Sequence, residues 1–296
     1  MLNVCYSKAY FAKTHTNSME KLTAIAEQLK QWRCIKFHQP LMMDLNLLRR
    51  LHDEQYVNAF LSGAEGKLAT SAGFKPWNSQ LRDAIIAINS GQLLAAELAF
   101  KHGISANIAQ GFHHAVYGYG GSFCTFNGLA LVALKYQNKK IFVLDCDHHA
   151  GDGTTEFSNR LENLFNFSIY GAAGGLTSGV RSESRHIHST RGSFAQYTLA
   201  IYEAFQKAKL WEADLMIYQA GMDCHQADPL GGSTWFSSEL IEKREHLVFS
   251  LAKKNKIPLM FVLAGGYQPL EDLIPLHLKT FEIAYRIYYT KQHHDQ

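Results

Sequence analysis

Five short apolar runs, separated by longer segments with helical spacing, constrain the fold of this chain most. The runs lie at 104–110, 141–147, 164–170, 214–220 and 258–264, and they are rich in β-branched and aromatic residues. Segments with apolar residues at helical spacing lie at 17–29, 81–102, 127–137, 193–210, 238–255 and 270–289. Strands that are apolar on both faces and alternate with helices predict a central, mostly parallel sheet with helices on both sides. The expected fold class is therefore a three-layer α/β/α architecture.

We expect one domain over residues 1–290. The 296 residues contain no internal repeat, no low-complexity linker and no break in composition. The remaining segment, KQHHDQ at 291–296, is predicted to be a polar tail with solvated histidines. Asn17 and Glu20 have the spacing of a capping box for the first helix, and Gly103 predicts the end of the helix at 81–102. Gly91, inside that helix, predicts close packing against a neighbour.

Composition predicts a soluble cytoplasmic protein. Hydrophobic residues make up 47% of the chain and charged residues 19%, and the net charge of +3 includes no dense Lys/Arg block. This balance argues against a nucleic-acid or membrane-surface partner, and neither a signal peptide nor a membrane-spanning run is evident. The five cysteines form no C-x-x-C pair, so neither a disulfide framework nor a thiolate zinc site is indicated.

Four of the five apolar runs end in polar sequence. The clusters are GFHHA (111–115), DCDHHAGDG (145–153), AGMDCHQADPLGG (220–232) and AGGY (264–267). In open parallel sheets, ligand sites form beyond the carboxyl ends of the strands. The sequence therefore predicts that the four clusters converge on one crevice.

The second cluster predicts a metal site. Asp147 and His149 are two residues apart at a strand end. A carboxylate and an imidazole suit Zn²⁺, with Fe²⁺ as the alternative. Asp223, after another run, is the best candidate for a third ligand, and three protein ligands leave a position open for water and substrate. The alternative interpretation is a set of solvated loop acids with a helix N-cap among them.

The other clusters predict acid–base and electrostatic groups. His113 and His114 can exchange protons near neutral pH, with Asp145 and Asp152 as spare acids to orient them. The alternative is a pair of half-buried histidines. Tyr267 can donate to a developing oxyanion or can simply cap the core. Together with an open-position metal, these groups predict hydrolysis of an amide or ester carbonyl, and no G-x-S-x-G motif competes.

These motifs, in this order, resemble the zinc-dependent histone deacetylase superfamily. The segments that carry the resemblance are GFHHA with SFCTFN, VLDCDHHAGDG, YQAGMDCHQADPLGG and AGGY. The compact length and the segments DPLGG, KREHLVF and GGYQ resemble class IV members of bacterial type. The resemblance runs from about 6–10 to the last helix. It implies the arginase/deacetylase fold and the removal of acetyl or longer acyl groups from the ε-amine of lysine.

The resemblance also implies roles for single residues. Zinc ligands are Asp147, His149 and Asp223. His114 is the general base and then acid, supported by Asp152; His113 is its electrostatic partner, supported by Asp145; and Tyr267 binds the carbonyl and the oxyanion. Phe123, Ser122 and Gly265 correspond to the substrate tunnel, and Asp145, Asp147, His149 and Ser168 to a potassium (K⁺) site. His148 has no catalytic role.

Two departures and one unmatched segment stand beside these roles. Ser122 occupies a place where the family usually has glycine, and Ala150 one often taken by His or Gln. The stretch 171–192 matches no family segment, so the second tunnel wall is unassigned. We expect this stretch to be a mobile loop over the site, with His186 and His188 on the surface.

Three other functions are weighed against a lysine deacylase. A two-metal arginase or agmatinase needs a second set of bridging acids, typically D-x-D. Here His225 stands two positions after Asp223, so the second metal lacks one of its usual acids. An acetylpolyamine amidohydrolase resembles a longer version of the fold, and 296 residues leave little room for its inserted loop. A non-catalytic acyl-lysine-binding protein would not need all three ligands, both histidines and Tyr267. This chain has all of them, which argues against that class. The expected partner is an acyl-lysine protein or peptide, or a small acylated amine.

Overall fold

The central sheet of the computed structural model, which describes residues 1–64 and 66–290, has eight strands. In chain order they are β1 (Leu2–Cys5), β2 (Ile35–His38), β3 (Ile104–Gln110), β4 (Ile141–Asp145), β5 (Leu164–Tyr170), β6 (Ser182–His186), β7 (Leu215–Ala220) and β8 (Leu259–Leu263). Their order in space is β2-β1-β3-β8-β7-β4-β5-β6, and every strand pairing is parallel. The predicted tail at 291–296 lies outside the described residues.

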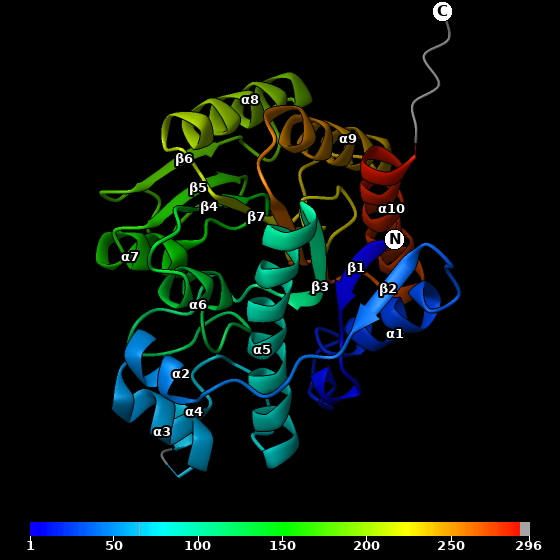
Figure 1. Ribbon diagram of the computed structural model, residues 1–296. Coiled ribbons are helices and arrows are strands. Elements are labelled where there is room, and N and C mark those ends of the chain that lie inside the picture. Colours follow the sequence, from blue (N-terminus) through cyan, green and yellow to red (C-terminus); the bar gives the residue numbers. More distant parts are fainter. Residues whose placement is uncertain (65, 291–296) are drawn as a thin grey trace, which may run out of the picture.

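Helices cover both faces of this sheet (Figure 1). They are α1 (Glu20–Leu29), α2 (Asn46–Leu51), α3 (Glu54–Ser62), α4 (Gly66–Ala69), α5 (Ser79–His102), α6 (Gly128–Lys135), α7 (Asp152–Arg160), α8 (Phe194–Leu210), α9 (Ser238–Asn255) and α10 (Leu270–Tyr289), with a 3₁₀ turn at Lys8–Tyr10. Helices α1, α8, α9 and α10 pack side by side on one face, and α5, α6 and α7 on the other. The predicted three-layer α/β/α fold is confirmed.

The five predicted strands are all present because their residues are buried on both faces. Strands β4, β7 and β8 are fully buried, and β3 and β5 are buried up to their last residue. Such strands need apolar residues at every position, and that is the signal the sequence carries. Strands β1 and β2 were not predicted because four residues give too short a pattern.

The prediction of a loop over 171–192 was wrong for residues 182–186, which form the edge strand β6. This strand has no apolar run because ion pairs with α8 replace much of the apolar burial. Arg185 bonds Glu203, and the Lys207 ammonium lies 2.6 Å from a carboxylate oxygen of Glu183. His186 is exposed and His188 is half-buried.

Helix ends follow their capping residues, with one exception. The side chain of Asn78 accepts a hydrogen bond from the Leu81 amide at the start of α5, and Gly103 ends that helix at φ 81°. The predicted capping box of α1 was wrong. The N-cap position is Met19, which makes no side-chain bond, and Asn17 contributes only its backbone carbonyl to the Lys21 amide.

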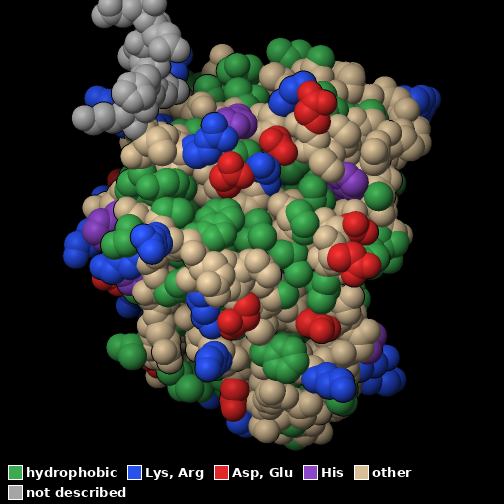
Figure 2. Space-filling model, turned by 90° about the vertical axis from the view of Figure 1, so that its right-hand side faces the viewer, with side chains coloured by type: hydrophobic (Ala, Val, Ile, Leu, Met, Phe, Trp, Pro, Cys, Tyr) green, Lys and Arg blue, Asp and Glu red, His purple; other side chains and the backbone are tan. Residues whose placement is uncertain are grey.

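The surface carries mixed charge. On the face in Figure 2, acidic and basic side chains lie interspersed. Within residues 1–64 and 66–290, no helix is both long and apolar enough to cross a membrane. The five cysteines are all free thiols.

Gly91 shows how tightly α5 packs against the first turn of the chain. A Cβ atom at this position would come within 1.7 Å of the Tyr10 hydroxyl oxygen, which donates to Asn107 at 2.8 Å. We expect Gly91→Ala to lower the melting temperature. Overpacking of about 1–3 kcal/mol outweighs the roughly 1 kcal/mol that alanine adds to helix propensity.

The control for Gly91→Ala is Gly66→Ala in α4, where no atom lies within 4 Å of the added Cβ. We expect this variant to keep or slightly raise the melting temperature, as measured by thermal unfolding. An equal effect of the two substitutions would contradict the packing argument.

Candidate metal centre and catalytic site

The four polar clusters follow four strands that are adjacent in the sheet. Strands β3, β8, β7 and β4 are neighbours in that order, although they are far apart along the chain. Because all four run in the same direction, their carboxyl ends meet at one edge. The predicted convergence of the clusters is therefore a consequence of strand order.

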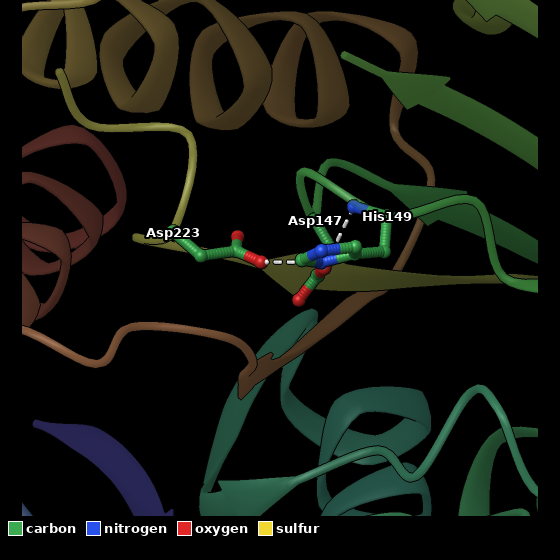
Figure 3. A group of neighbouring side chains, drawn as sticks. All are labelled: Asp147, His149 and Asp223. Atoms are coloured by element: carbon green, nitrogen blue, oxygen red, sulfur yellow. Dashed lines mark hydrogen bonds and ion pairs between the residues drawn. The ribbon is translucent and has the colours of Figure 1, made fainter. Parts of the chain in front are cut away.

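Asp147, His149 and Asp223 form the cluster at the centre of this edge (Figure 3). One potential ligand atom from each residue lies within 4.8 Å of the other two. Nδ1 of His149 lies 3.0 Å from Asp223 Oδ2 and 3.3 Å from Asp147 Oδ1. Asp147 and Asp223 are buried, and His149 is half-buried toward the outer recess. The described residues contain no second cluster of this kind.

Two buried carboxylates this close require a positive charge between them. Burial, together with the charge of Asp147, raises the pKa of Asp223 to about 7. Burial disfavours the charged form of His149, but hydrogen bonds and charges from Asp147 and Asp223 outweigh it and raise the pKa of His149 to about 11. A divalent cation meets the same need. Two carboxylates and one imidazole fit Zn²⁺, and they also fit Fe²⁺.

Backbone groups fix the orientation of both carboxylates. Oδ2 of Asp147 accepts from the Gly265 amide at 2.7 Å, and Oδ1 of Asp223 accepts from the His148 amide at 2.9 Å. The part of His148 that serves the site is therefore its backbone. Its ring is buried, and its Nδ1 has no hydrogen-bond partner among the described residues.

Each histidine of the pair contacts one acid. Nδ1 of His113 lies 2.7 Å from Asp145 Oδ2, and Nδ1 of His114 lies 2.6 Å from Asp152 Oδ1. The two imidazole rings are 4.0 Å apart between centroids. Because Nδ1 of each ring is engaged, Nε2 is the nitrogen that remains for chemistry.

The environments of the two histidines separate their protonation states. Burial of His113 opposes its charge, but the carboxylates of Asp145 and Asp147 prevail and raise the pKa of His113 to about 9. Burial and the charge of His113 lower the pKa of His114. A general base must be neutral before it accepts a proton, and the lowered pKa of His114 favours that state.

Two glycines allow the AGGY segment to approach the acids. A Cβ atom on Gly265 would lie 2.3 Å from Asp223 Oδ2, and Gly266 has φ 140°, so neither position accepts a side chain. The Tyr267 amide then donates to Asp228 Oδ2 at 2.7 Å. Burial and the charges of Asp147 and Asp223 raise the pKa of Tyr267, so its phenol remains a donor.

Two neighbouring cavities with shared lining residues border this site. The outer recess has a volume of about 270 Å³ and is lined by His114, Ser122, Phe123, His149, Leu230 and Tyr267. A smaller inner cavity of about 20 Å³ shares Ser122, Phe123 and Tyr267 with it and also borders Asp147 and Gly265. Ser122 adopts φ 46°, which suits glycine better than serine.

Leu230 lines the recess together with Phe123, so it is a candidate for the second tunnel wall that the sequence left unassigned. It is 58% exposed, and a single leucine in a loop gives no sequence signal for such a position.

Ser168 is the register partner of Asp145 across β5 and β4, and its hydroxyl accepts from the Gly151 amide at 3.3 Å. His225 bonds Ser238 at 3.0 Å instead of joining the cluster.

The sequence also gave no role to Arg244, which supports both ligand segments from behind. This fully buried side chain of α9 donates to the backbone oxygens of Gly221 at 2.7 Å and Cys146 at 3.4 Å. It also pairs with Glu245. The burial of these two charged residues could have been predicted from the sequence. Both fall on the helical stripe that α9 buries, which also contains Ile241, Val248, Phe249 and Ala252.

Comparison with known proteins identifies related sequences. A family model described as histone deacetylase domain matches residues 15–280. An uncharacterized protein of Picosynechococcus sp. is 30% identical over 258 residues, which is 85% of each chain. Histone deacetylase 2 of Arabidopsis thaliana is 29% identical over 234 residues, or 73% of this chain and 59% of that protein.

Acetylpolyamine enzymes are also among the similar proteins. Acetylpolyamine amidohydrolase 2 of Pseudomonas aeruginosa is 25% identical over 171 residues, or 52% of this chain and 48% of that protein. A solved acetylpolyamine aminohydrolase of Burkholderia pseudomallei has a TM-score of 0.78 at 15% identity, covering 97% of this chain and 99% of that one. The fold is thus of the arginase/deacetylase type.

Asp223 is a candidate metal ligand, whereas His148 has no predicted role in metal binding. Substitutions at these two residues should therefore have opposite effects on zinc content. Asp223→Asn removes a charged ligand, so bound zinc should fall to a trace. His148→Leu keeps the backbone amide that holds Asp223, so this variant should retain about one zinc per chain. Metal content of the purified variants, measured by mass spectrometry, gives the answer. Loss of zinc from His148→Leu would mean that the ligands are wrongly assigned.

Proposed function

Because the chain belongs to the histone deacetylase family and is a hydrolase of the deacetylase type, we propose that it removes acyl groups from the ε-amine of lysine. The observation that carries the proposal is the outer recess, which leads past Phe123 and Leu230 to the Asp147–His149–Asp223 cluster. A lysine side chain is a neutral alkyl chain once its amine is acylated. Such a chain fits a recess with aromatic and aliphatic walls.

We assign the metal to Asp147, His149 and Asp223, with Zn²⁺ as the proposed ion. When bound, the ion polarises the acyl carbonyl and lowers the pKa of a water molecule. His114 takes a proton from the attacking water at Nε2 while Asp152 holds Nδ1. The charged ring of His113 lies beside it and adds positive potential for the developing oxyanion.

The Tyr267 hydroxyl donates to the carbonyl oxygen as its charge grows. The water oxygen forms a bond to the acyl carbon, and the carbon–nitrogen bond breaks. His114 returns its proton to the departing amine, so the products are a carboxylic acid and free lysine. Ser122 and Gly265 lie along the path of the substrate, with Phe123 as its aromatic wall.

Three further assignments complete the proposal. A potassium ion is assigned to Asp145, Asp147, His149 and Ser168, and the pairing of Asp145 with Ser168 supports it. Residues 1–290 are taken as one catalytic domain. A cytoplasmic location agrees with five free thiols.

A second candidate is hydrolysis of acetylpolyamines, which the similarity to acetylpolyamine enzymes favours. A polyamine keeps one or more positive charges after acetylation, so its binding needs carboxylates along the recess. None of the six residues that line the outer recess is acidic. This favours the lysine substrate.

Tyr267→Phe tests the oxyanion donor. We expect kcat to fall by about a hundredfold or more, because the lost bond strengthens only in the transition state. Zinc content and the melting temperature should stay at their original values, since the Tyr267 backbone bond to Asp228 remains. A near-normal rate would refute the assigned role.

A substrate series tests the function itself. We expect kcat/KM for an acetyl-lysine peptide to exceed that for acetylputrescine and acetylspermidine by at least about tenfold, which corresponds to about 1.4 kcal/mol. Rates are measured with Zn²⁺ and with Fe²⁺. The reverse ranking would establish the polyamine function, and bound zinc with no turnover of any substrate would favour an acyl-lysine-binding protein.

A further inference from the structure

The inner cavity is the place where the acyl group of a bound substrate must lie. It borders His113, Asp147, Gly265 and Tyr267, the groups that surround the reacting carbonyl, and it shares three residues with the outer recess. The lysine chain occupies the recess, so the acyl carbons beyond the carbonyl point inward. The size of the inner cavity therefore limits the acyl group.

This cavity is small. Its volume of about 20 Å³ is the space open to the centre of a water-sized group. One water molecule needs about 10–15 Å³ by this measure. The cavity therefore has room for a group of methyl size, and a longer alkyl chain would need the wall to open.

Gln110 is one of the residues that line the inner cavity. It is the last residue of β3, and its register with β8 shifts between Asn107 and Gln110. Such an irregularity re-aims a side chain at a strand end. The neighbouring lining positions Gly111 and Gly265 contribute no side chain, so Gln110 supplies bulk that its neighbours lack.

Hydrogen bonds hold the Gln110 side chain in this position. Its Nε2 donates to the Ser18 carbonyl oxygen at 3.0 Å, and its own backbone oxygen accepts from Gln92 Nε2 at 2.8 Å. Ser18 is 3% exposed, so its carbonyl would lose a donor that water cannot easily replace if Gln110 swung aside. The side chain is thus a fixed part of the wall.

Gln219 also lines the inner cavity. It lies on the fully buried strand β7, and its Oε1 would be 2.3 Å from a Cβ atom at Gly111. The amide oxygens of Gln110 and Gln219 are both buried without a partner among the described residues. Acceptors in this state disfavour a long alkyl chain as a neighbour.

We propose that Gln110 is a specificity-determining residue that restricts the acyl group to about the size of acetyl. The proposal rests on the lysine deacylase function for the identity of the substrate, but not for the size of the cavity. It follows from the small volume of the inner cavity, the hydrogen-bonded Gln110 side chain and the glycines beside it.

The experiment compares peptides with acetyl-, butyryl- and octanoyl-lysine on three proteins. Wild type should prefer acetyl over octanoyl. Gln110→Ala should raise kcat/KM for the longer acyl groups by at least about tenfold, the scale of one methylene in a pocket, and should leave acetyl within a few-fold. Gln110→Leu keeps most of the bulk but loses the bond to the Ser18 carbonyl, so its gain for the longer acyl groups should be smaller than that of Gln110→Ala. Octanoyl turnover equal to acetyl in wild type, or no gain in Gln110→Ala, would overturn the proposal.

A binding measurement separates this proposal from the proposed function. Acetate, butyrate and octanoate are titrated into the zinc-loaded proteins by calorimetry, which requires no turnover. Acetate should bind wild type more tightly than octanoate, and Gln110→Ala should narrow the difference. If that ranking holds but no acyl-lysine is hydrolysed, the lysine function fails while the size limit stands. Equal binding of the three anions to wild type would refute the size limit.

Discussion

Repulsion between two buried carboxylates, Asp147 and Asp223, is the constraint on which the rest of the site depends. Neither group has water to screen it, and burial with the neighbouring charge raises the pKa of Asp223 to about 7. One positively charged imidazole and two backbone amides offset the repulsion between the carboxylates. His149 lies between the acids, and the amides of His148 and Gly265 each donate to one of them. A divalent cation is the natural centre of such an arrangement.

The same constraint explains the layer behind the ligands. Fixed carboxylates need a fixed backbone, and Arg244 bonds the carbonyl groups beside both of them. A buried guanidinium is itself costly to desolvate, and Glu245 compensates its charge while accepting from the Tyr218 hydroxyl. The Arg244–Glu245 ion pair is thus the part of α9 that holds the backbone beside both carboxylates.

The sequence predicted well what depends on burial and strand ends. Strands β3, β4, β5, β7 and β8 were recognisable because two buried faces demand apolar residues throughout, and strand order then brought Asp147, His149 and Asp223 together. Prediction failed where the stabilising partner lies far along the chain. The edge strand β6 depends on ion pairs with α8, and Leu230 lines the recess only because the loop after Asp228 folds over it. Neither dependence leaves a local pattern.

Chemistry and specificity are separable at this site because different kinds of residue control them. The chemistry requires positions with no freedom: Gly265 must lack a side chain, and each histidine must keep its acid. The depth of the cavity depends instead on Gln110, which touches no ligand and is held by a backbone carbonyl of another segment. A change there alters space without altering charge at the metal cluster. Acyl preference can therefore diverge among proteins that share the proposed ligands and the proposed proton carrier, and a catalytic motif alone does not determine it.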